Sequence, residues 1–338
     1  MRNLLPLQPW FLEKKRDLPW RTRRDPYATW IAEVMLQQTV AQVVVPYFTR
    51  WLEHLPDIES LAKASKEEVM KLWEGLGYYS RARNLLKGAQ YVMAHFGGEL
   101  PKTRDLLLTI PGIGPYTSAA IAAFAFGQKV AAVDANVARF ISRFEEIEDK
   151  VLLEESATSL LPDHEPWITA EAMIEMGATI CRKKPDCPSC PVQSACKAFA
   201  SHRQYELPLP TKRAATTYLE KSILIPYHQS KFLLKNPHTR GVMADLWEFP
   251  EAPLTCTYEE SLSLAPQKHS FTRFVVTLNP TVLFLVNPFD QTGYSWYSLE
   301  DMEGLAFSSG HRRILRDLYD HFTHRSLARM GRARDPHL

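Results

Sequence analysis

The sequence predicts a chain of two domains, an all-helical domain followed by an α+β domain. Segments with helical periodicity and helix-start signals fill the first 180 residues. Four of the five cysteines follow within residues 181–196, and short β-type runs begin only after a proline-containing linker. With 338 residues and 45% hydrophobic content, the chain is long enough for two domains of ordinary size, each with its own core.

The overall charge does not mark the chain as a nucleic-acid binder. Forty Lys and Arg residues against 38 Asp and Glu residues give a net charge of only +2. Any evidence for nucleic-acid binding must therefore come from local basic clusters such as residues 14–24. In the arginine-rich residues 311–338 a solvated basic face is the simpler interpretation. No apolar run has transmembrane length, and prolines interrupt the first twenty residues. We therefore expect no membrane partner and a cytoplasmic location.

Residues 27–36 predict a helix with one acid, Glu33, among apolar neighbours. A glutamate in a helix usually faces solvent, but this one has little polar company. If it is partly buried, its pKa should be raised, and it should hold a proton near neutral pH, as a general acid requires. Residues 39–42 match a capping box, which predicts a new helix and places Gln37 and Gln38 in an exposed joint.

A glycine-hinged loop at residues 75–80 carries Tyr78 and leads into Arg81. A capping pattern at residues 65–68 predicts a helix before this loop, and another helix is expected over residues 83–96. Loops that combine aromatic and arginine side chains stack on nucleic-acid bases. The alternative is a tyrosine pair that packs in the core at a helix start.

Residues 103–127 predict a helix-hairpin-helix motif. Thr103 can cap a short helix, and a second helix is expected to begin at Pro115. In the turn between them, Gly112 and Gly114 let bare backbone N–H groups approach a partner. The positive end of the second helix points the same way, an arrangement that suits a phosphate.

Asp134 stands at the expected start of a further helix, residues 136–144. An aspartate at such a position is most often only an N-cap. However, a carboxylate held there is kept ionised by the helix dipole and by backbone N–H groups, which is the state needed to face a developing positive charge.

The spacing of four cysteines is typical of metal ligands rather than of a disulfide framework: Cys181-x5-Cys187-x2-Cys190-x5-Cys196. This run directly follows a helix expected over residues 166–180. Four thiolates this close together suit a [4Fe–4S] cluster or a zinc ion, and spacing alone does not choose between them. A structural role is the default interpretation.

Taken together, six motifs resemble those of the MutY family of adenine DNA glycosylases. They are PWR at 19–21, EVMLQQT at 33–39, GLGYYSR at 75–81, PGIGPY at 111–116, VDANV at 133–137 and the cysteine run. The resemblance covers nearly the whole chain and favours the [4Fe–4S] cluster. It implies a monomer that binds duplex DNA, nucleoid-associated in a bacterium, and removes adenine mispaired with 8-oxoguanine or guanine.

The resemblance also implies an architecture. Residues 1–203 would form the helix-hairpin-helix glycosylase domain, and residues 204–216 the linker. Residues 217–325 would form a Nudix-like domain for lesion recognition, and residues 326–338 a disordered basic tail. The acidic REUxEE box of Nudix hydrolases is absent, so metal-dependent pyrophosphate hydrolysis is not expected.

The same resemblance implies residue roles. Glu33 would protonate adenine N7, Asp134 would stabilise the oxocarbenium-like sugar, and two residues, Tyr116 and Asn136, would support that intermediate. The pocket for the extruded adenine would consist of Trp20, Arg21, Leu36 and Glu171. The expected DNA contacts are Gln37, Gln38, Tyr78, Arg81, Gly112, Gly114 and Thr272.

Tyr116 separates this chain from endonuclease III, a relative that places a Schiff-base lysine at this hairpin position. No lysine lies between Lys102 and Lys129, so we expect a monofunctional glycosylase without efficient lyase activity. The alternatives are a pyrimidine-damage glycosylase similar to endonuclease III and a non-catalytic mismatch-binding iron–sulfur protein.

The sequence departs from the family pattern at two places. The first gap between cysteines has five residues, one fewer than is usual, which leaves zinc or a distorted cluster as the alternatives. In the loop over 8-oxoguanine, Phe271-Thr272-Arg273 replaces the usual Phe-Ser-His. Thr272 keeps a hydroxyl for hydrogen bonding, and the missing histidine predicts weaker lesion discrimination.

Overall fold

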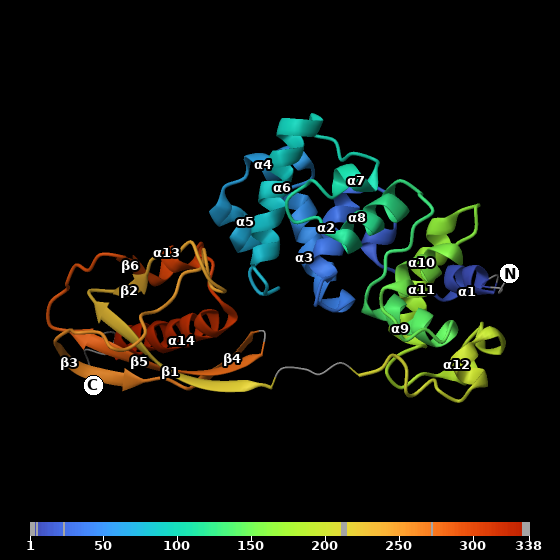
Figure 1. Cartoon of the computed structure of the whole chain (residues 1–338). Helices are drawn as coiled ribbons and strands as arrows, with labels where there is room; N and C mark the ends of the chain where they lie inside the picture. Colours follow the sequence, from blue (N-terminus) through green and yellow to red (C-terminus); the bar gives the residue numbers. More distant parts are fainter. Residues whose placement is uncertain (1–3, 5, 23, 211–214, 272, 333–338) are drawn as a thin grey trace. The chain divides into compact units, whose positions relative to one another are not determined.

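The chain divides into two compact units in a computed structural model that describes residues 4, 6–22, 24–210, 215–271 and 273–332 (Figure 1). Unit 1 comprises Met1–Ala64 and Asn84–Lys212, and unit 2 comprises Ser65–Arg83 and Arg213–Leu338. One division point falls within the linker expected at residues 204–216. The other two, on either side of Ser65–Arg83, were not expected, because they assign this segment to the C-terminal unit.

Unit 1 is helical, as predicted. Its helices are α1 (Leu7–Lys14), α2 (Pro26–Leu36), α3 (Ala41–His54), α4 (Ile58–Lys63), α7 (Arg104–Leu107), α8 (Pro115–Ala120), α9 (Ala135–Phe144), α10 (Leu152–Ser159), α11 (Pro166–Thr179) and α12 (Lys197–Ala200), with short turns η1 (Pro19–Arg21), η2 (Ile121–Ala125), η3 (Cys187–Ser189) and η4 (Gln193–Ala195). Helix α6 (Ser80–Phe96) begins in unit 2 and continues into unit 1.

Local signals explain most helix starts. Asp25 caps α2 by accepting a hydrogen bond from the Ala28 N–H, and a proline occupies the first position of the helix. The capping box expected at residues 39–42 does not form, and Val40 is the N-cap of α3 without a side-chain bond. The reason is local: Gln38 adopts a positive φ of 61°, and the Thr39 N–H bonds the Leu36 carbonyl to close the joint.

The helix-hairpin-helix motif is present as α7, a glycine turn and α8. Gly112 has φ +86°, and a Cβ there would lie 2.5 Å from the Asn84 Cβ, so only glycine fits. Gly114 is the N-cap of α8, and a Cβ at this position would meet nothing within 4 Å, so the turn is open on that side. Helix α8 continues into the π-helical turn η2, which is buried among alanines.

Helices α9 and α11 approach closely in the core of unit 1. A Cβ on Gly177 of α11 would lie 2.5 Å from the Asn136 carbonyl oxygen of α9. The surrounding core includes Met173, Met176 and Phe140, all nearly inaccessible. Because a larger residue at position 177 would separate the two helices, this contact fixes the start of α9 against α11.

Unit 2 consists of a six-stranded sheet and three helices of its own. Its elements are α5 (Lys66–Leu72), β1 (Thr217–His228), β2 (Lys231–Lys235), β3 (Tyr258–Ser263), β4 (Gln267–Phe271), β5 (Phe274–Leu285), β6 (Tyr294–Ser298), α13 (Leu299–Glu303) and α14 (Ser309–Arg332). The strand order is β3-β5-β1-β2-β6, β4 also pairs with β5, and only β1 and β5 are parallel. Helix α14 lies against the sheet (Figure 1), and its Ile314, Leu315 and Leu318 share one core with the strands.

The sequence predicted two strands where β5 is continuous. Pro280 lies in the middle, between the partner segments Gln267–Phe271 and Tyr258–Ser263, so its missing N–H falls where the neighbouring strand changes. Helix α14 continues to Arg332, into the tail expected at residues 326–338, because Leu, Ala, Arg and Met are good helix formers. Residues 333–338 lie outside the described residues.

Candidate active site

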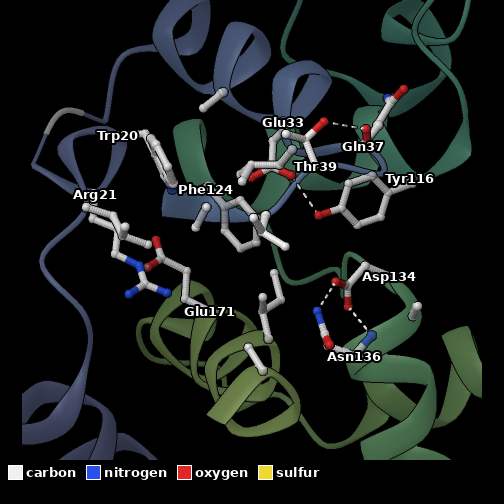
Figure 2. Close-up of a pocket in the computed structure, with 18 of the residues that line it drawn as sticks. Trp20, Arg21, Glu33, Gln37, Thr39, Tyr116, Phe124, Asp134, Asn136 and Glu171 are labelled. Atoms are coloured by element: carbon white, nitrogen blue, oxygen red, sulfur yellow. Dashed lines mark hydrogen bonds and ion pairs between the residues drawn. The ribbon is translucent and has the colours of Figure 1, made fainter. Parts of the chain in front are cut away.

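A cavity of about 920 Å³ in unit 1 contains most of the predicted site residues (Figure 2). Its walls come from η1, α2, the joint after α2, α8 with η2, the start of α9, and α11. The predicted residues that line it are Trp20, Arg21, Glu33, Leu36, Gln37, Gln38, Tyr116, Asp134, Asn136 and Glu171. The two proposed catalytic carboxyls, far apart in sequence, therefore face one cavity.

Glu33 is buried on α2, with 6% of its surface exposed. Burial raises the pKa of its carboxyl to about 7, because the charged form loses its hydration among apolar neighbours. The Tyr116 hydroxyl donates a 2.6 Å hydrogen bond to Oε2, which favours the ionised form and opposes this rise. The raised pKa expected from the sequence is confirmed.

Asp134 is the N-cap of α9 and has polar partners of its own. Its Oδ1 accepts hydrogen bonds from the N–H groups of Asn136 and Val137, at 2.9 and 2.8 Å, and its Oδ2 accepts from the Asn136 side-chain amide at 2.7 Å. Burial still raises the pKa of the Asp134 carboxyl, and these hydrogen bonds only oppose the rise. The predicted cap is confirmed, but the expected net stabilisation of the charged form is wrong, because desolvation in the cavity is the larger effect.

Arg139 connects the Asp134 site to the start of the cysteine loop. Its guanidinium donates to the Asn136 Oδ1 at 2.8 Å, to the Gly177 carbonyl at 2.6 Å and to the Cys181 carbonyl at 2.8 Å. Asn136 is thereby oriented with its amide nitrogen toward Asp134. Arg139 was not predicted from the sequence, although it follows Asn136 by three residues and so lies on the same helix face.

Arg21 is held at the cavity wall by two acids of α11. Its guanidinium lies 3.3 Å from Glu171 and 2.7 Å from Glu175. Glu175, which is fully buried, also accepts from Arg16 at 2.7 Å. Two arginines around one buried carboxylate lower its pKa despite burial. Glu171 carries no such pair of bonds, and burial raises the pKa of its carboxyl.

Several apolar residues that were not predicted also line the cavity, and Phe124 and Ile174 are among the largest side chains of this set. Phe124 of η2 and Ile174 of α11 line it with their side chains, and Figure 2 labels Phe124 beside Glu33. The available signal was the pair of aromatic residues, Phe124 and Phe126, in the alanine-rich run after the hairpin. An apolar wall of this kind suits a flat heterocyclic ligand.

The other predicted DNA contacts lie outside this cavity. Gly112 and Gly114 are in the hairpin turn of unit 1, and Tyr78 is an exposed loop residue of unit 2. Thr272 lies outside the described residues. The role expected for Arg81 needs correction: its side chain is buried and donates to the Leu76 and Gly77 carbonyls, so it braces its own loop.

The four clustered cysteines surround a second, small cavity of about 30 Å³. None of them is in a disulfide. The buried Arg143 donates to the Cys181 Sγ at 3.5 Å and to the Arg182 and Leu207 carbonyls, so a cation lies beside the thiols and joins their loop to the linker. Within the described ranges, no three His, Cys, Asp or Glu side chains are placed to hold a metal ion.

A four-cysteine set with an arginine beside it fits an anionic iron–sulfur cluster in its donor chemistry. Thiolates are the usual ligands of such clusters. Burial raises the pKa of the Cys187 thiol, and the Arg143 guanidinium opposes this rise. The cavity faces are otherwise apolar, with Phe140, Phe144 and Val192 among them, which limits access of water.

We expect Glu33→Gln to change the pH dependence of stability. In the wild type, the protonated carboxyl contributes stability that is complete below the unfolded-state pKa of 4.5 and is lost as the pH rises to about 7. The free energy of unfolding of the variant minus that of the wild type should therefore be about 3 kcal/mol larger at pH 8 than at pH 4. Urea unfolding at both pH values measures this difference.

The exposed Glu53→Gln, on α3, is the control for the loss of one carboxyl group. A Glu33→Gln difference that stays constant between pH 4 and pH 8 would contradict a buried, protonated acid.

Comparison with known proteins agrees with both units. Residues 31–162 match the family described as HhH-GPD superfamily base excision DNA repair protein, and residues 222–317 match the NUDIX domain family. A solved structure of a thermostable thymine-DNA glycosylase aligns with a TM-score of 0.54 and 31% identity, over 58% of this chain and 94% of that one. Among the described residues, no helix combines the length and apolar character needed to cross a bilayer.

Two curated relatives show the family more specifically. The chain is 42% identical to the adenine DNA glycosylase of Homo sapiens over 218 residues, which are 60% of this chain and 40% of that protein. It is 31% identical to the adenine DNA glycosylase of Buchnera aphidicola subsp. Baizongia pistaciae over 244 residues, 70% of each chain. The chain thus spans about two fifths of the length of the human relative. The second relative shows that the chain belongs to the adenine DNA glycosylase family, and the cavity and the hairpin agree with this assignment.

Proposed function

We propose that the protein hydrolyses the N-glycosidic bond of adenine mispaired with 8-oxoguanine or guanine in duplex DNA. The observation that carries this proposal is the shared cavity of Glu33 and Asp134, in which Glu33 has a pKa of about 7. Two carboxyls with different environments at one site are the arrangement expected of an acid and a charge-stabilising partner. Family membership supports the reaction class, and the names of the relatives support adenine as the base.

The cavity volume supports a mechanism in which the adenine leaves the DNA stack. About 920 Å³ is ample for a base with its sugar, and an enzyme acting on a base in a duplex must extrude it. Glu33 then gives its proton to adenine N7. The bond from N9 to C1′ breaks, and its electron pair goes to the departing base. Water adds to C1′ and releases a proton, leaving an abasic site.

Asp134 is the residue that faces the positive charge on the sugar in this mechanism. A developing cation beside it favours its ionised form, which offsets the effect of burial. The three hydrogen bonds from α9 hold its oxygens in place before the reaction, so no reorganisation is needed when charge appears. The Tyr116 hydroxyl, bonded to Glu33, orients the acid.

Duplex DNA is the proposed partner, bound by one copy of this chain. The hairpin turn offers N–H groups near Gly114 at the start of α8, where phosphate binding is favourable. Gln37 and Gln38 line the cavity next to the α2–α3 joint. Gln38 has a positive φ and an exposed side chain, and exposure is what a side chain that enters the vacated stack requires. Tyr78 is proposed for the same role from unit 2.

We also propose that Cys181, Cys187, Cys190 and Cys196 hold a [4Fe–4S] cluster. Support comes from their shared cavity and from the adjacent Arg143 guanidinium. Such a cluster supplies a rigid cross-link for the loop between α11 and α12. Arg139 donates to the Cys181 carbonyl in this loop and to the Asn136 side chain, so the position of the loop affects the orientation of Asn136.

The first test is adenine release under single-turnover conditions from a duplex with adenine opposite 8-oxoguanine. Glu33→Gln and Asp134→Asn should each lower the rate by about 10² to 10⁴. The wild-type rate should fall as the pH rises through about 7, because Glu33 loses the proton it donates. Alkaline cleavage of the labelled strand measures the product.

Glu53→Gln should leave the rate unchanged. If either active-site variant keeps the wild-type rate, the assigned acid or charge-stabilising residue is wrong. Equal rates opposite 8-oxoguanine and guanine would remove the proposed lesion preference.

The second test concerns the lyase step. Because Tyr116 occupies the hairpin position and has no amine, borohydride should trap little or no covalent adduct with wild-type protein. Tyr116→Lys places an amine in the cavity and should raise trapping clearly above wild type. Strong trapping by the wild type, seen as a slower band on a denaturing gel, would refute a monofunctional enzyme.

The third test is metal content. Purified protein should be brown and carry about four iron atoms per chain. Cys190→Ser should lose the colour, whereas Cys256→Ser, which changes the one cysteine outside the run, should keep it. A colourless wild-type protein that contains zinc would overturn the cluster assignment.

A further inference from the structure

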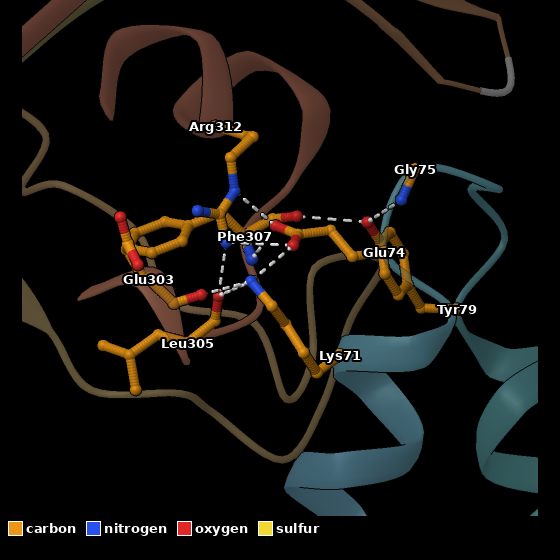
Figure 3. Close-up of polar contacts among 8 residues, drawn as sticks. All are labelled: Lys71, Glu74, Gly75, Tyr79, Glu303, Leu305, Phe307 and Arg312. Carbon is orange, nitrogen blue, oxygen red and sulfur yellow. Dashed lines mark hydrogen bonds and ion pairs between the residues drawn. The ribbon is translucent and has the colours of Figure 1, made fainter. Parts of the chain in front are cut away.

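Unit 2 brings Ser65–Arg83 against residues 303–312 of the C-terminal sheet domain, more than 200 positions away in the sequence (Figure 3). The Glu74 carboxylate accepts from the Arg312 Nε at 2.7 Å and from its second guanidinium nitrogen at 2.9 Å. The Phe307 N–H adds a third bond of 2.9 Å to Glu74. The Glu74 and Arg312 side chains are only 14% and 24% exposed, so this paired geometry is worth more than a surface ion pair.

Lys71 and Tyr79 make the remaining contacts across the same surface. The Lys71 ammonium donates to the Glu303 and Leu305 carbonyls, at 2.5 and 3.1 Å, and so satisfies the C-terminal end of α13. The Tyr79 hydroxyl donates to the Phe307 carbonyl at 3.1 Å and accepts the Gly75 N–H at 3.3 Å. The Phe307 backbone is therefore bonded on both sides by the segment that contains Tyr78.

The bonded residues lie on both sides of a loop with an unusual backbone. Gly75, Gly77 and Tyr78 have φ values of +103°, +70° and +48°. A non-glycine residue at positive φ persists only where its surroundings hold it. Inside the loop, the Arg81 guanidinium and the Trp73 indole both donate to the Gly77 carbonyl. At the two ends of the loop, Glu74 and Tyr79 are bonded to Arg312 and Phe307 of the C-terminal domain.

Tyr78 is the residue that this arrangement presents. It is 49% exposed, whereas its neighbour Tyr79 is 6% exposed and is bonded inward. A large exposed aromatic side chain on a strained loop suits stacking on a base. Fixing the loop before DNA arrives reduces the ordering that binding would otherwise require.

We propose that residues 303–307 and Arg312 form a docking surface that holds the Gly75–Tyr79 loop in the conformation that presents Tyr78 to DNA, with Arg312 as a positioning residue. This inference rests on the proposed function in so far as Tyr78 contacts the mispaired duplex. It assigns the C-terminal domain a mechanical part in DNA binding, separate from any contact it makes with the lesion itself.

The test compares Arg312→Met with Arg316→Met in the full chain. Methionine keeps an apolar stem at position 312, where the guanidinium lies 5.0 Å from the Phe307 ring centroid, but makes no bond to Glu74. Arg316 is exposed on the same helix, so its substitution removes the same charge without touching the loop. Hydrogen exchange without DNA should be about fivefold or more faster for amides 75–80 in Arg312→Met only.

A double-mutant cycle then tests whether Arg312 acts through Tyr78. Affinity is measured for a duplex with 8-oxoguanine opposite a non-cleavable adenine analogue. Arg312→Met should weaken binding about tenfold when Tyr78 is present and less than about twofold when the chain also carries Tyr78→Ala. Arg312→Lys should recover part of the loss. Glu74→Gln, which keeps an acceptor for the Phe307 N–H, should reproduce the exchange result if Arg312→Met does not fold.

Unchanged exchange in the loop would overturn the proposal. An equal affinity loss with and without the Tyr78 ring would overturn the role of Arg312 as a positioning residue. The exchange measurement uses no DNA, so it decides the docking even if the wild type releases no adenine. Failure of the proposed function and failure of this inference are thus distinguishable.

Discussion

The site depends on the burial of one carboxyl in an apolar helix. Helix α2 is buried from Tyr27 to Met35, so the Glu33 carboxyl is largely removed from water, and within the described residues it accepts a hydrogen bond from the Tyr116 hydroxyl. Desolvation outweighs that bond and sets a pKa of about 7, where an acid can both hold and give a proton at neutral pH. Keeping such a group costs stability above that pH, and the large apolar core of unit 1 offsets the cost.

Asp134, the second carboxyl of the cavity, has more hydrogen-bond partners than Glu33. Asp134 is also partly desolvated, but three hydrogen bonds from α9 hold both of its oxygens. The Asn136 amide that makes one of them is oriented by Arg139, which reaches two carbonyls at the end of α11 and the start of the cysteine loop. Arg139 spans this distance only because Gly177 lets α11 approach α9. The position of Asp134 is therefore a property of helix packing as much as of its cap.

Local signals predicted the helical domain and the two carboxyls of the cavity, and the family resemblance supplied the wall residues Trp20, Arg21, Leu36 and Glu171. Helical spacing of apolar residues located α2, Pro, Gly and Asp signals located α8 and α9, and one acid in an apolar helix identified Glu33. What failed was information that depends on tertiary partners. The outward strand β3 has almost no buried residues and no alternation to detect, Arg81 turns inward to the carbonyls of its own loop, and the pKa of Asp134 depends on how deeply the folded cavity buries it.

The membership of Ser65–Arg83 in unit 2 has a further consequence for how the domains divide. By sequence, the linker near residues 204–216 separates two halves, and a cut there looks neutral. By contacts, such a cut removes every partner that Glu74 and Lys71 have on residues 303–312 and leaves a partly buried carboxylate without its arginine. After such a cut the Glu74 carboxylate keeps, among the described residues, only its bond to the Lys71 ammonium, at 2.9 Å, and loses the two Arg312 bonds and the Phe307 N–H. The N-terminal half is therefore not complete at the linker, since the conformation of one of its loops is determined by the residues that follow.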